Sequence, residues 1–319
     1  MNVSTINATK TSDPDSFIQA QSIAISGANG LVGTALKSRL KANRVQILNV
    51  TRRAVAALND VSWDPAAGVV DASRLNGADA FVHLAGENIA TSRWTAAKRD
   101  RIRESRVEGT RIIAESLAAL SSKPSVMICA SAIGFYGNRG EQILDETAAA
   151  GDGFLADVCR DWESATRPAI DAGIRVVHLR IGVIISRHGG ALPRMLMPFR
   201  MGVGGRVGSG RQYWSWISLE DVVGAIEHCL AHPEISGPVN CVTPTPVTNL
   251  EFTKALGRVL SRPTILPMPA FAAKLALGQM AEDLLLTSAR VIPERLMESG
   301  YTFRQPELVQ ALQTEIRQA

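Results

Sequence analysis

The sequence has few of the residues that build a metal centre, a disulfide framework or a membrane span. Its four cysteines and five histidines are scattered, without a CxxC pair or a Cys/His ligand spacing, so we expect reduced thiols and no metal site. No apolar run approaches about 18 residues, the length of a membrane-spanning helix. Residues 1–20 are polar and lack the apolar core of a signal peptide, so we expect a disordered tail on a cytoplasmic protein.

An excess of one charge is also missing. The chain has 34 Lys and Arg against 30 Asp and Glu, a net charge of +4, and the basic residues lie among acidic ones. This argues against a nucleic-acid-binding stripe and suits small anionic ligands. Hydrophobic residues make up 46% and charged residues 20% of the chain, which predicts an ordinary globule with a substantial core.

Glycines, by contrast, mark a clear motif near the N-terminus. A short apolar run, 22–26, is followed by Gly27, Gly30 and Gly33, then by an amphipathic segment and a second strand at 44–50. Strand, glycine turn, helix and strand form a βαβ unit. A plain turn would also use glycines. Between a strand and a helix, however, they allow a sharp turn, close approach of phosphates and close helix packing, so we predict a dinucleotide site.

The residues around this turn predict which dinucleotide binds. A helix beginning near Leu31 directs free N–H groups and its positive dipole end at a pyrophosphate. The second strand ends at Arg52 and Arg53, and no acid follows until Asp60. Arginine there pairs with a 2′-phosphate, whereas a carboxylate would accept from a 2′-hydroxyl. We therefore predict NADP(H) rather than NAD; the alternative is two solvated arginines.

The rest of the chain predicts a doubly wound α/β fold with a second lobe. Further strands are expected at 80–84, 125–130 and 174–180, and helices at 95–120 and 153–172. This alternation predicts a Rossmann-type parallel sheet over residues 21–185. We interpret the charged start of the helix at 95–120 as a solvated face.

The C-terminal part, 186–319, is broken by prolines and predicts a smaller lobe that closes over the cofactor. Its segment at about 211–230 is expected to return to the sheet. Helices are predicted at 248–260, with Asn249 as a possible cap, and at 270–278.

Several motifs resemble the extended short-chain dehydrogenase/reductases, the group of nucleotide-sugar epimerases and dehydratases. They are GANGLVG, the strand end HLAG, SAIGFYG and SWISLEDVVGAI. HLAGENIATSRW, FLADVCRDWE and IPERLMESGYTF more narrowly resemble the epimerase-family subgroup labelled SulA-like or cell-division-inhibitor-like, with its characteristic C-terminal domain. The resemblance spans about residues 22–315. It implies a Rossmann-type fold, an NADP-type cofactor and a C-terminal lobe that shapes a substrate cleft.

The motifs and the resemblance together predict a cofactor site. Its residues are Gly27, Asn29, Gly30, Leu31, Val32, Gly33, Arg52, Arg53, Asp64, Leu84, Ala85, Gly86, Glu87, Ala130, Ser131, Arg180 and Gly182. Arg180 has an equally good interpretation as part of a structural ion pair.

The sequence departs from the extended family where that family does its chemistry. Those enzymes use a Ser or Thr, a Tyr, a Lys four residues later and a supporting Asn for acid–base work beside the hydride acceptor. Aligned on Glu163, this chain has Leu155 at the Tyr position and Cys159 at the Lys position, and Arg106 falls on the Asn. The Tyr-x-x-x-Lys pair therefore cannot be transferred to this chain. A buried helix thiol is the expectation for Cys159.

The catalytic residues are thus unassigned, with Ser131 and Tyr136 as candidates. Ungapped alignment puts Ala132 at the catalytic Ser position and Ser131 one residue earlier. Ser131 could instead cap its strand, and Tyr136 could simply pack. Glu87 and Arg93 are further proton-transfer candidates at the cleft.

Rare aromatic and basic residues predict the substrate cleft. Its residues are Arg93, Trp94, Tyr136, Arg194, Trp214 and Trp216. Core packing is the alternative for the tryptophans.

Two hypotheses from different classes follow. The first is an NADP(H)-binding oxidoreductase or epimerase-like enzyme with a non-standard proton relay and a small-molecule substrate. The second is a catalytically silent NADP(H)-binding sensor or interaction protein, linked to cell division by the subgroup label. Neither hypothesis requires binding to a nucleic acid or to a membrane. The resemblance also implies a homodimer through the segments 95–120 and 153–172.

Overall fold

The computed structural model describes residues 20–52, 55, 57–91 and 93–317. The tail predicted for residues 1–20 lies outside this range apart from Ala20, and so does Arg53. Along the described residues, no helix combines the length and the apolarity that crossing a membrane requires.

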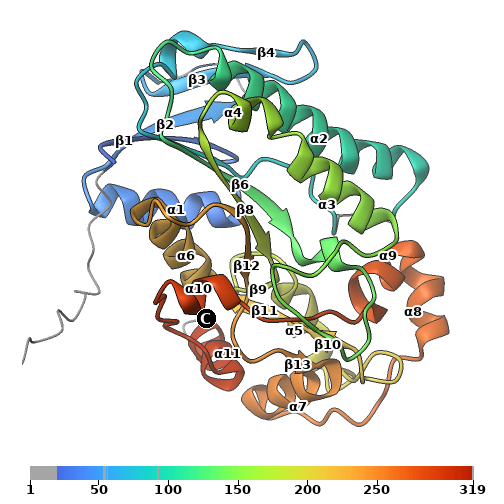
Figure 1. Ribbon diagram of the computed structural model, residues 1–319. Coiled ribbons are helices and arrows are strands. Elements are labelled where there is room, and N and C mark those ends of the chain that lie inside the picture. The colour runs from blue at the N-terminus through green and yellow to red at the C-terminus, as the bar shows by residue number, and fades with distance from the viewer. Residues whose placement is uncertain (1–19, 53–54, 56, 92, 318–319) are drawn as a thin grey trace, which may run out of the picture.

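Eight strands form one large sheet in the order β12-β8-β6-β5-β1-β2-β3-β4 (Figure 1). All neighbouring strands are parallel except the pair β3 and β4. This sheet confirms the predicted α/β, Rossmann-type fold. The strands are β1 (Ser22–Ser26), β2 (Gln46–Thr51), β3 (Asp60–Asp64), β4 (Val69–Val70), β5 (Ala80–His83), β6 (Val126–Ala132), β8 (Arg175–Ile181) and β12 (Gly237–Cys241).

Helices cover both faces of this sheet, as a doubly wound fold requires (Figure 1). One face carries α1 (Leu31–Ala42) and α6 (Leu219–Ala231), and the other carries α2 (Ala96–Ala118), α3 (Phe154–Ser164) and α4 (Arg167–Asp171). Each face has its own buried apolar layer. Strand order reverses direction between β1 and β5, and ligands of open α/β sheets bind at the carboxyl ends of the strands at such a point.

The single helix predicted over 153–172 is wrong, because the chain forms α3 and α4 with a break between them. Pro168 lies in the first turn of α4. A proline donates no backbone hydrogen bond and its ring clashes with the carbonyl four residues earlier, so a helix running through this position would be broken.

The C-terminal half builds a second lobe below the sheet (Figure 1). Its core brings together Trp214 and Trp216 with apolar residues of three helices. The remaining elements are η1 (Ala72–Arg74), η2 (Ile133–Tyr136), β7 (Ile143–Leu144), β9 (Val183–Ile185), α5 (Leu192–Arg200), β10 (Tyr213–Trp214), β11 (Trp216–Ser218), β13 (Val247–Thr248), α7 (Asn249–Leu260), α8 (Ala270–Leu277), α9 (Gln279–Ala281), η3 (Glu282–Leu286), β14 (Arg290–Val291), α10 (Glu294–Glu298) and α11 (Leu308–Arg317).

The segment 211–230 contributes to both lobes. Its strands β10 and β11 pair with β13 and β9 in small two-stranded sheets, while α6 covers the large sheet. The strand that enters the large sheet is β12, beside β8. The cap predicted at Asn249 is wrong, because Thr248 caps α7 in a capping box with Glu251. The Asn249 side chain instead accepts a hydrogen bond from the backbone of Val207 at 2.8 Å.

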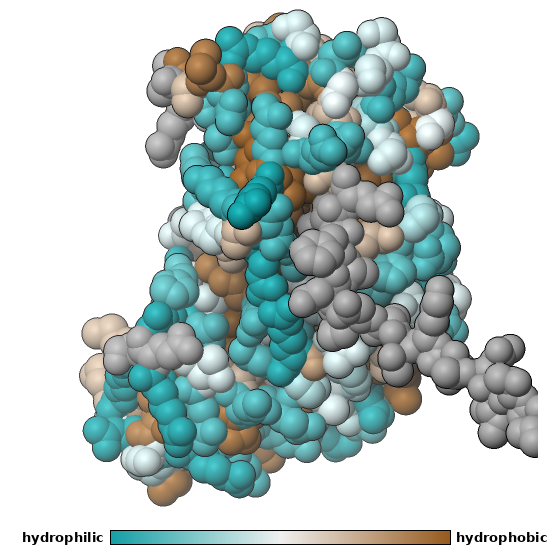
Figure 2. Space-filling view, turned by 90° about the vertical axis from the view of Figure 1, so that its left-hand side faces the viewer, coloured by the Kyte–Doolittle hydropathy of each residue, from teal (hydrophilic) through white to brown (hydrophobic). Residues whose placement is uncertain are grey.

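The face that carries α1 and α6 is mostly hydrophilic, with hydrophobic side chains showing between the polar ones (Figure 2). Arg39 of α1 pairs here with Glu220 and Glu227 of α6, at 3.6 and 3.7 Å. These half-buried pairs link the two helices, and ion pairs near a protein surface each contribute about 0–1 kcal/mol.

Candidate functional site

The glycine turn between β1 and α1 has no room for side chains at two of its three glycines. Gly27 has a φ of 72°, and a Cβ there would lie 2.6 Å from the carbonyl carbon of Leu84. A Cβ on Gly33 would lie 2.3 Å from the carbonyl oxygen of Gly27. The turn therefore packs directly on the end of β5, at the point where strand order reverses.

The third glycine faces more open space. Among the described residues, a Cβ on Gly30 would meet only the Gly27 carbonyl oxygen, at 3.2 Å. Gly30 is also the N-cap of α1 and has no side-chain cap, so the first N–H groups of the helix, on Leu31 and Val32, lack intrahelical acceptors. This is a cradle for a phosphate group. Asn29 lies beside it and accepts a hydrogen bond from Lys37 at 2.9 Å.

Two predicted cofactor residues lie at the carboxyl ends of neighbouring strands, β2 and β3. Arg52 comes directly after β2 and is exposed, so its side chain is free to meet a ligand at the sheet edge. Asp64 ends β3 and accepts from the backbone N–H groups of Ala66 and Ala67, at 3.0 and 3.1 Å. Asp64 thus stabilises its own turn.

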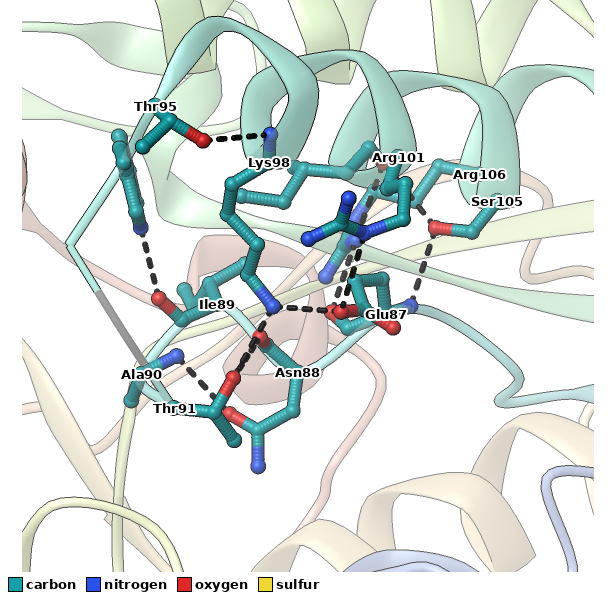
Figure 3. A network of polar contacts seen from close by, with 12 residues as sticks. Glu87, Asn88, Ile89, Ala90, Thr91, Thr95, Lys98, Arg101, Ser105 and Arg106 are labelled. Carbon is teal, nitrogen blue, oxygen red and sulfur yellow. Dashed lines mark hydrogen bonds and ion pairs between the residues drawn. The ribbon is translucent and has the colours of Figure 1, made fainter.

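The loop after β5 carries a polar network centred on Glu87 (Figure 3). The Nζ of Lys98 donates to Glu87 Oε1 at 2.5 Å and to the Thr91 hydroxyl at 3.0 Å. Arg101 approaches the same carboxylate at 4.0 Å. The hydrogen bond from Lys98 lowers the pKa of Glu87, and the positive charges of Arg101 and Arg52 lower it further. Glu87 is therefore ionised at neutral pH.

Lys98 was missed by the sequence reasoning. It belongs to the charged run at the start of α2, which we interpreted as a solvated face, but only 2% of it is exposed. That interpretation is wrong for the inner side of the helix, which also buries Ile102. The available signal was helical spacing, since Lys98, Ile102 and Arg106 recur every four residues.

Arg106 lies on the same inner side. Its Nη1 donates to the carbonyl oxygens of Glu87 and Ile102, at 3.1 and 3.2 Å, and its guanidinium carbon lies 5.0 Å from the ring centre of Trp162. Burial lowers the pKa of Arg106, although not enough to remove its charge, because an arginine stays protonated in proteins.

The two catalytic candidates belong to a second, buried network. Ser131 donates to Glu163 at 2.7 Å, and Arg180 binds the same carboxylate with two hydrogen bonds of 2.8 Å. Arg180 also donates to the Tyr136 hydroxyl at 2.9 Å, and that hydroxyl donates to Asn240 at 2.7 Å. Arg180 therefore forms a structural ion pair, as the alternative to a cofactor contact proposed. Tyr136 is fully buried, which agrees with a packing role.

The three tryptophans predicted for the substrate cleft are also buried in the protein core. Trp214 is 6% exposed and Trp216 is fully buried, in the C-terminal core. Trp94 stacks edge-on against Phe154, 5.5 Å between ring centres, and donates to the Ile89 carbonyl at 2.7 Å. The packing alternative thus describes all three tryptophans.

The other predicted residues differ in exposure. Arg93 and Arg194 are exposed, as is Gly86, while Leu84 and Ala85 are half-buried and Ala130 is buried. A Cβ on Gly182 would lie 2.6 Å from the Ser215 carbonyl oxygen, which explains that glycine by packing.

The positions aligned with the family's Tyr and Lys are apolar or unreactive. Leu155 packs with Trp94, Ile102 and Met280, where the C-terminal lobe meets α2 and α3. Cys159 is 3% exposed, and burial raises the pKa of its thiol to about 12. Such a thiol stays protonated at neutral pH and is a poor nucleophile. Within the described residues, no three His, Cys, Asp or Glu side chains gather to hold a metal ion.

A Rossmann-type sheet with a phosphate cradle at its reversal point defines a dinucleotide-binding class of protein. Within that class, residues 23–241 match the NAD dependent epimerase/dehydratase family, and residues 268–315 match a domain of unknown function, DUF1731. The chain belongs to the NAD dependent epimerase/dehydratase family.

Individual relatives agree with this assignment. The chain is 45% identical over 290 residues to the epimerase family protein Mb2239 of Mycobacterium bovis, covering 91% of this chain and 96% of the relative. It is 35% identical to the epimerase family protein YfhF of Bacillus subtilis, covering 91% and 96%. The crystal structure of the human epimerase family protein SDR39U1 with NADPH superposes with a TM-score of 0.85 at 32% identity, covering 93% of this chain and 100% of that one.

Proposed function

We propose that this chain binds NADP(H) at the glycine turn and acts as an oxidoreductase or epimerase-like enzyme on a small-molecule substrate. The observation that carries the proposal is the cradle formed by Gly27, Gly30 and Gly33, where two glycines allow close backbone packing and the third faces open space. The similar human protein was crystallised with NADPH. When bound, a nicotinamide supplies hydride transfer; the chain supplies binding and orientation.

Arg52 is proposed to select NADP(H) over NAD(H) by pairing with the 2′-phosphate. The test is thermal unfolding with NADPH, NADP, NADH and NAD, on the wild type, Arg52→Ala and the control Lys41→Ala. Lys41 is an exposed cation at the far end of α1. A ligand at about 100 times its dissociation constant adds roughly 2.7 kcal/mol to the free energy of unfolding.

We expect NADPH and NADP to stabilise the wild type and Lys41→Ala, and Arg52→Ala to lose most of that stabilisation. If none of the four dinucleotides shifts the unfolding transition of the wild type, the glycine turn does not bind a dinucleotide and the proposed function is wrong.

The proton relay of this enzyme is proposed to differ from the family's Tyr-x-x-x-Lys pair. Leu155 and Cys159 stand at the aligned positions, and Ser131 and Tyr136 hold partners in the buried network. Glu87 is the remaining acidic candidate, half-buried beside the cofactor cradle, and would act as a weak general base, because Lys98 lowers its pKa. Glu87→Gln should keep NADPH binding and lose turnover of any carbonyl substrate that a screen identifies; unchanged turnover would remove Glu87 from this role.

The second candidate function is a catalytically silent NADP(H)-binding sensor or interaction protein. It is supported by the burial of Ser131 and Tyr136 and by the apolar cluster around Leu155. NADPH consumption across a panel of aldehydes and ketones separates the two functions. Consumption with any member favours the enzyme, and tight binding without consumption favours the silent protein.

Three finer features are likewise proposals. They are the cell-division subgroup, a cytoplasmic location and a homodimer through the segments 95–120 and 153–172, which contain α2, α3 and α4. Light scattering after size exclusion tests the dimer, and a monomer at micromolar concentration would contradict it.

A further inference from the structure

Among the residues that the structure describes, Arg106 of α2 hydrogen-bonds backbone carbonyls and forms no ion pair. Its side chain is half-buried and lies against the backbone of Gly86, where a Cβ would come within 3.4 Å of the guanidinium carbon. In the part of the chain that the structure describes, only Nη1 has acceptors, and both are backbone carbonyls. The charge of Glu87 acts on Arg106 through space, but Lys98 already binds that carboxylate. A half-buried cation with so little compensation is costly unless a ligand supplies more.

Other arginines near Arg106 in sequence or in space do have acidic partners. Arg103 pairs with Asp161, Arg111 with Glu108 and Glu115, and Arg180 with Glu163. Arg106 therefore differs from these neighbours, although Arg99 of α2 also bonds an amide, that of Gln279, in place of an acid.

The free donors of Arg106 have a defined geometry. Because Nη1 is held by the carbonyls of Glu87 and Ile102, the Nε–H and Nη2–H groups remain on one edge of a planar guanidinium. Two parallel donors on such an edge match the two oxygens of a carboxylate or a phosphate. The guanidinium carbon also lies 5.0 Å from the ring centre of Trp162, and this contact together with the two hydrogen bonds of Nη1 leaves less side-chain entropy to be lost on binding.

The surrounding charge favours an anion. Lys98, Arg101 and Arg52 all act on the single carboxylate of Glu87, and Arg106 adds a further positive charge. A cleft lined by an excess of one sign attracts ligands of the other sign.

The position of Arg106 favours the substrate over the cofactor as the source of this anion. The glycine turn packs on Leu84 and Ala85, at the start of the loop. Arg106 contacts the later part of the same loop, Gly86 and Glu87, and is close enough to Cys159 of α3 to interact with it electrostatically. Arg106 therefore lies beyond the phosphate cradle, on the side of α3.

We propose that the Nε/Nη2 edge of Arg106 binds an oxyanion, a carboxylate or a phosphate, carried by the substrate. This assignment deepens the proposed function and rests on it, since the cofactor is taken to occupy the glycine turn. It gives the unknown substrate an acidic group within reach of the reacting end of the cleft.

The test titrates simple anions into the NADPH-saturated protein at constant ionic strength. The probes are acetate, oxalate, malonate, succinate and inorganic phosphate, followed by calorimetry and by the unfolding temperature. Arg106→Gln removes the charge and Arg106→Lys keeps it without the paired donors. Arg103→Gln is the matched control, on the same helix but already paired.

At least one probe should bind the wild type and Arg103→Gln equally, and Arg106→Gln should weaken that binding about tenfold or more. Arg106→Lys should recover only part of it, because an ammonium group cannot make the planar double contact. If Arg106→Gln does not fold, the comparison of Arg106→Lys with the wild type decides the question.

Three outcomes would overturn the proposal. No probe binds the wild type; Arg106→Gln binds the probes as the wild type does; or Arg106→Gln weakens NADPH tenfold and leaves anion binding unchanged, which would assign the edge to the cofactor pyrophosphate. Failure of NADPH to bind the wild type would instead contradict the proposed function, and the same anions titrated into the protein alone would then still decide the role of Arg106.

Discussion

Gly33 offers a substitution for which two physical effects predict opposite signs. Alanine is about 1 kcal/mol better than glycine inside a helix, so propensity alone predicts that Gly33→Ala stabilises α1. The new Cβ, however, would lie 2.3 Å from the carbonyl oxygen of Gly27 and 2.8 Å from the Cα of Ala28. Overpacking costs about 1–3 kcal/mol, and a contact with backbone, which cannot rotate away, belongs at the upper end.

The net expectation is therefore a loss of about 2 kcal/mol in the free energy of unfolding, roughly 3 from overlap less 1 from propensity. Urea unfolding of Gly33→Ala measures it. Moving the turn to make room also displaces the N–H groups of the cradle, so the affinity for NADPH should fall at the same time.

Gly109 of α2 is the matched control, because it is also a glycine within a helix. A Cβ there would meet the ring of Trp63 at 3.3 Å, a side-chain contact that a small shift relieves. Gly109→Ala should stay within about 1 kcal/mol of the wild type and keep its NADPH affinity. The reasoning is refuted if Gly33→Ala is as stable as Gly109→Ala and binds NADPH as the wild type does.

The remaining predictions concern buried polar groups. Glu163→Ala leaves the buried Arg180 without its counter-charge and should lower the free energy of unfolding in urea by about 3–5 kcal/mol. The control Glu115→Ala, at an exposed ion pair, should lower it by less than about 1 kcal/mol. A loss near 1 kcal/mol for Glu163→Ala would contradict a structural role for the network. Burial lowers the pKa of His83 from 6.5 to about 4. Between these values the unfolded state binds more protons than the folded one, so the free energy of unfolding falls as pH drops from about 6.5 to 4, by up to about 1.4 kcal/mol per pH unit. His83→Gln should flatten this slope and leave the parts that His178 and His228 add, because burial lowers the pKa of both, that of His228 to about 4. An unchanged slope would show that other groups cause it.

Local patterns predicted the part of the fold that builds the cofactor cradle. The strand at 22–26 and the helix start at Leu31 agree with β1 and α1. Both depend on signals confined to a few neighbouring residues, namely apolar runs, glycine spacing and a following amphipathic segment. The tight contact between Gly27 and the end of β5 also follows, because parallel strands of one sheet end at the same edge.

The inner side of α2 could not be predicted in the same way. A charged run at helical spacing is usually a solvated face, and what buries Lys98 is the loop 87–91 folding back over it. That fold-back is visible only in the contacts between the loop and α2, such as the hydrogen bond from the backbone of Glu87 to the Ser105 hydroxyl, 18 residues apart. The Ser131 network likewise joins β6, α3, β8 and β12, whose spacing in sequence carries no signal of their side-chain pairing.

The two polar clusters differ in how completely their hydrogen-bonding groups have partners, and this difference separates their roles. In the Arg180 cluster the guanidinium and both carboxylate oxygens of Glu163 have partners within the chain, so the cluster fixes β6, β8 and α3 to one another and has little left to offer a ligand. In the α2 cluster, Glu87 is ionised and half-buried, and Arg106 keeps two donors without acceptors among the described residues. Binding and proton transfer need groups that are held in place and yet unsaturated. The proposed chemistry should therefore be sought around the start of α2, whereas the Tyr and Lys positions of the extended family align with α3 here.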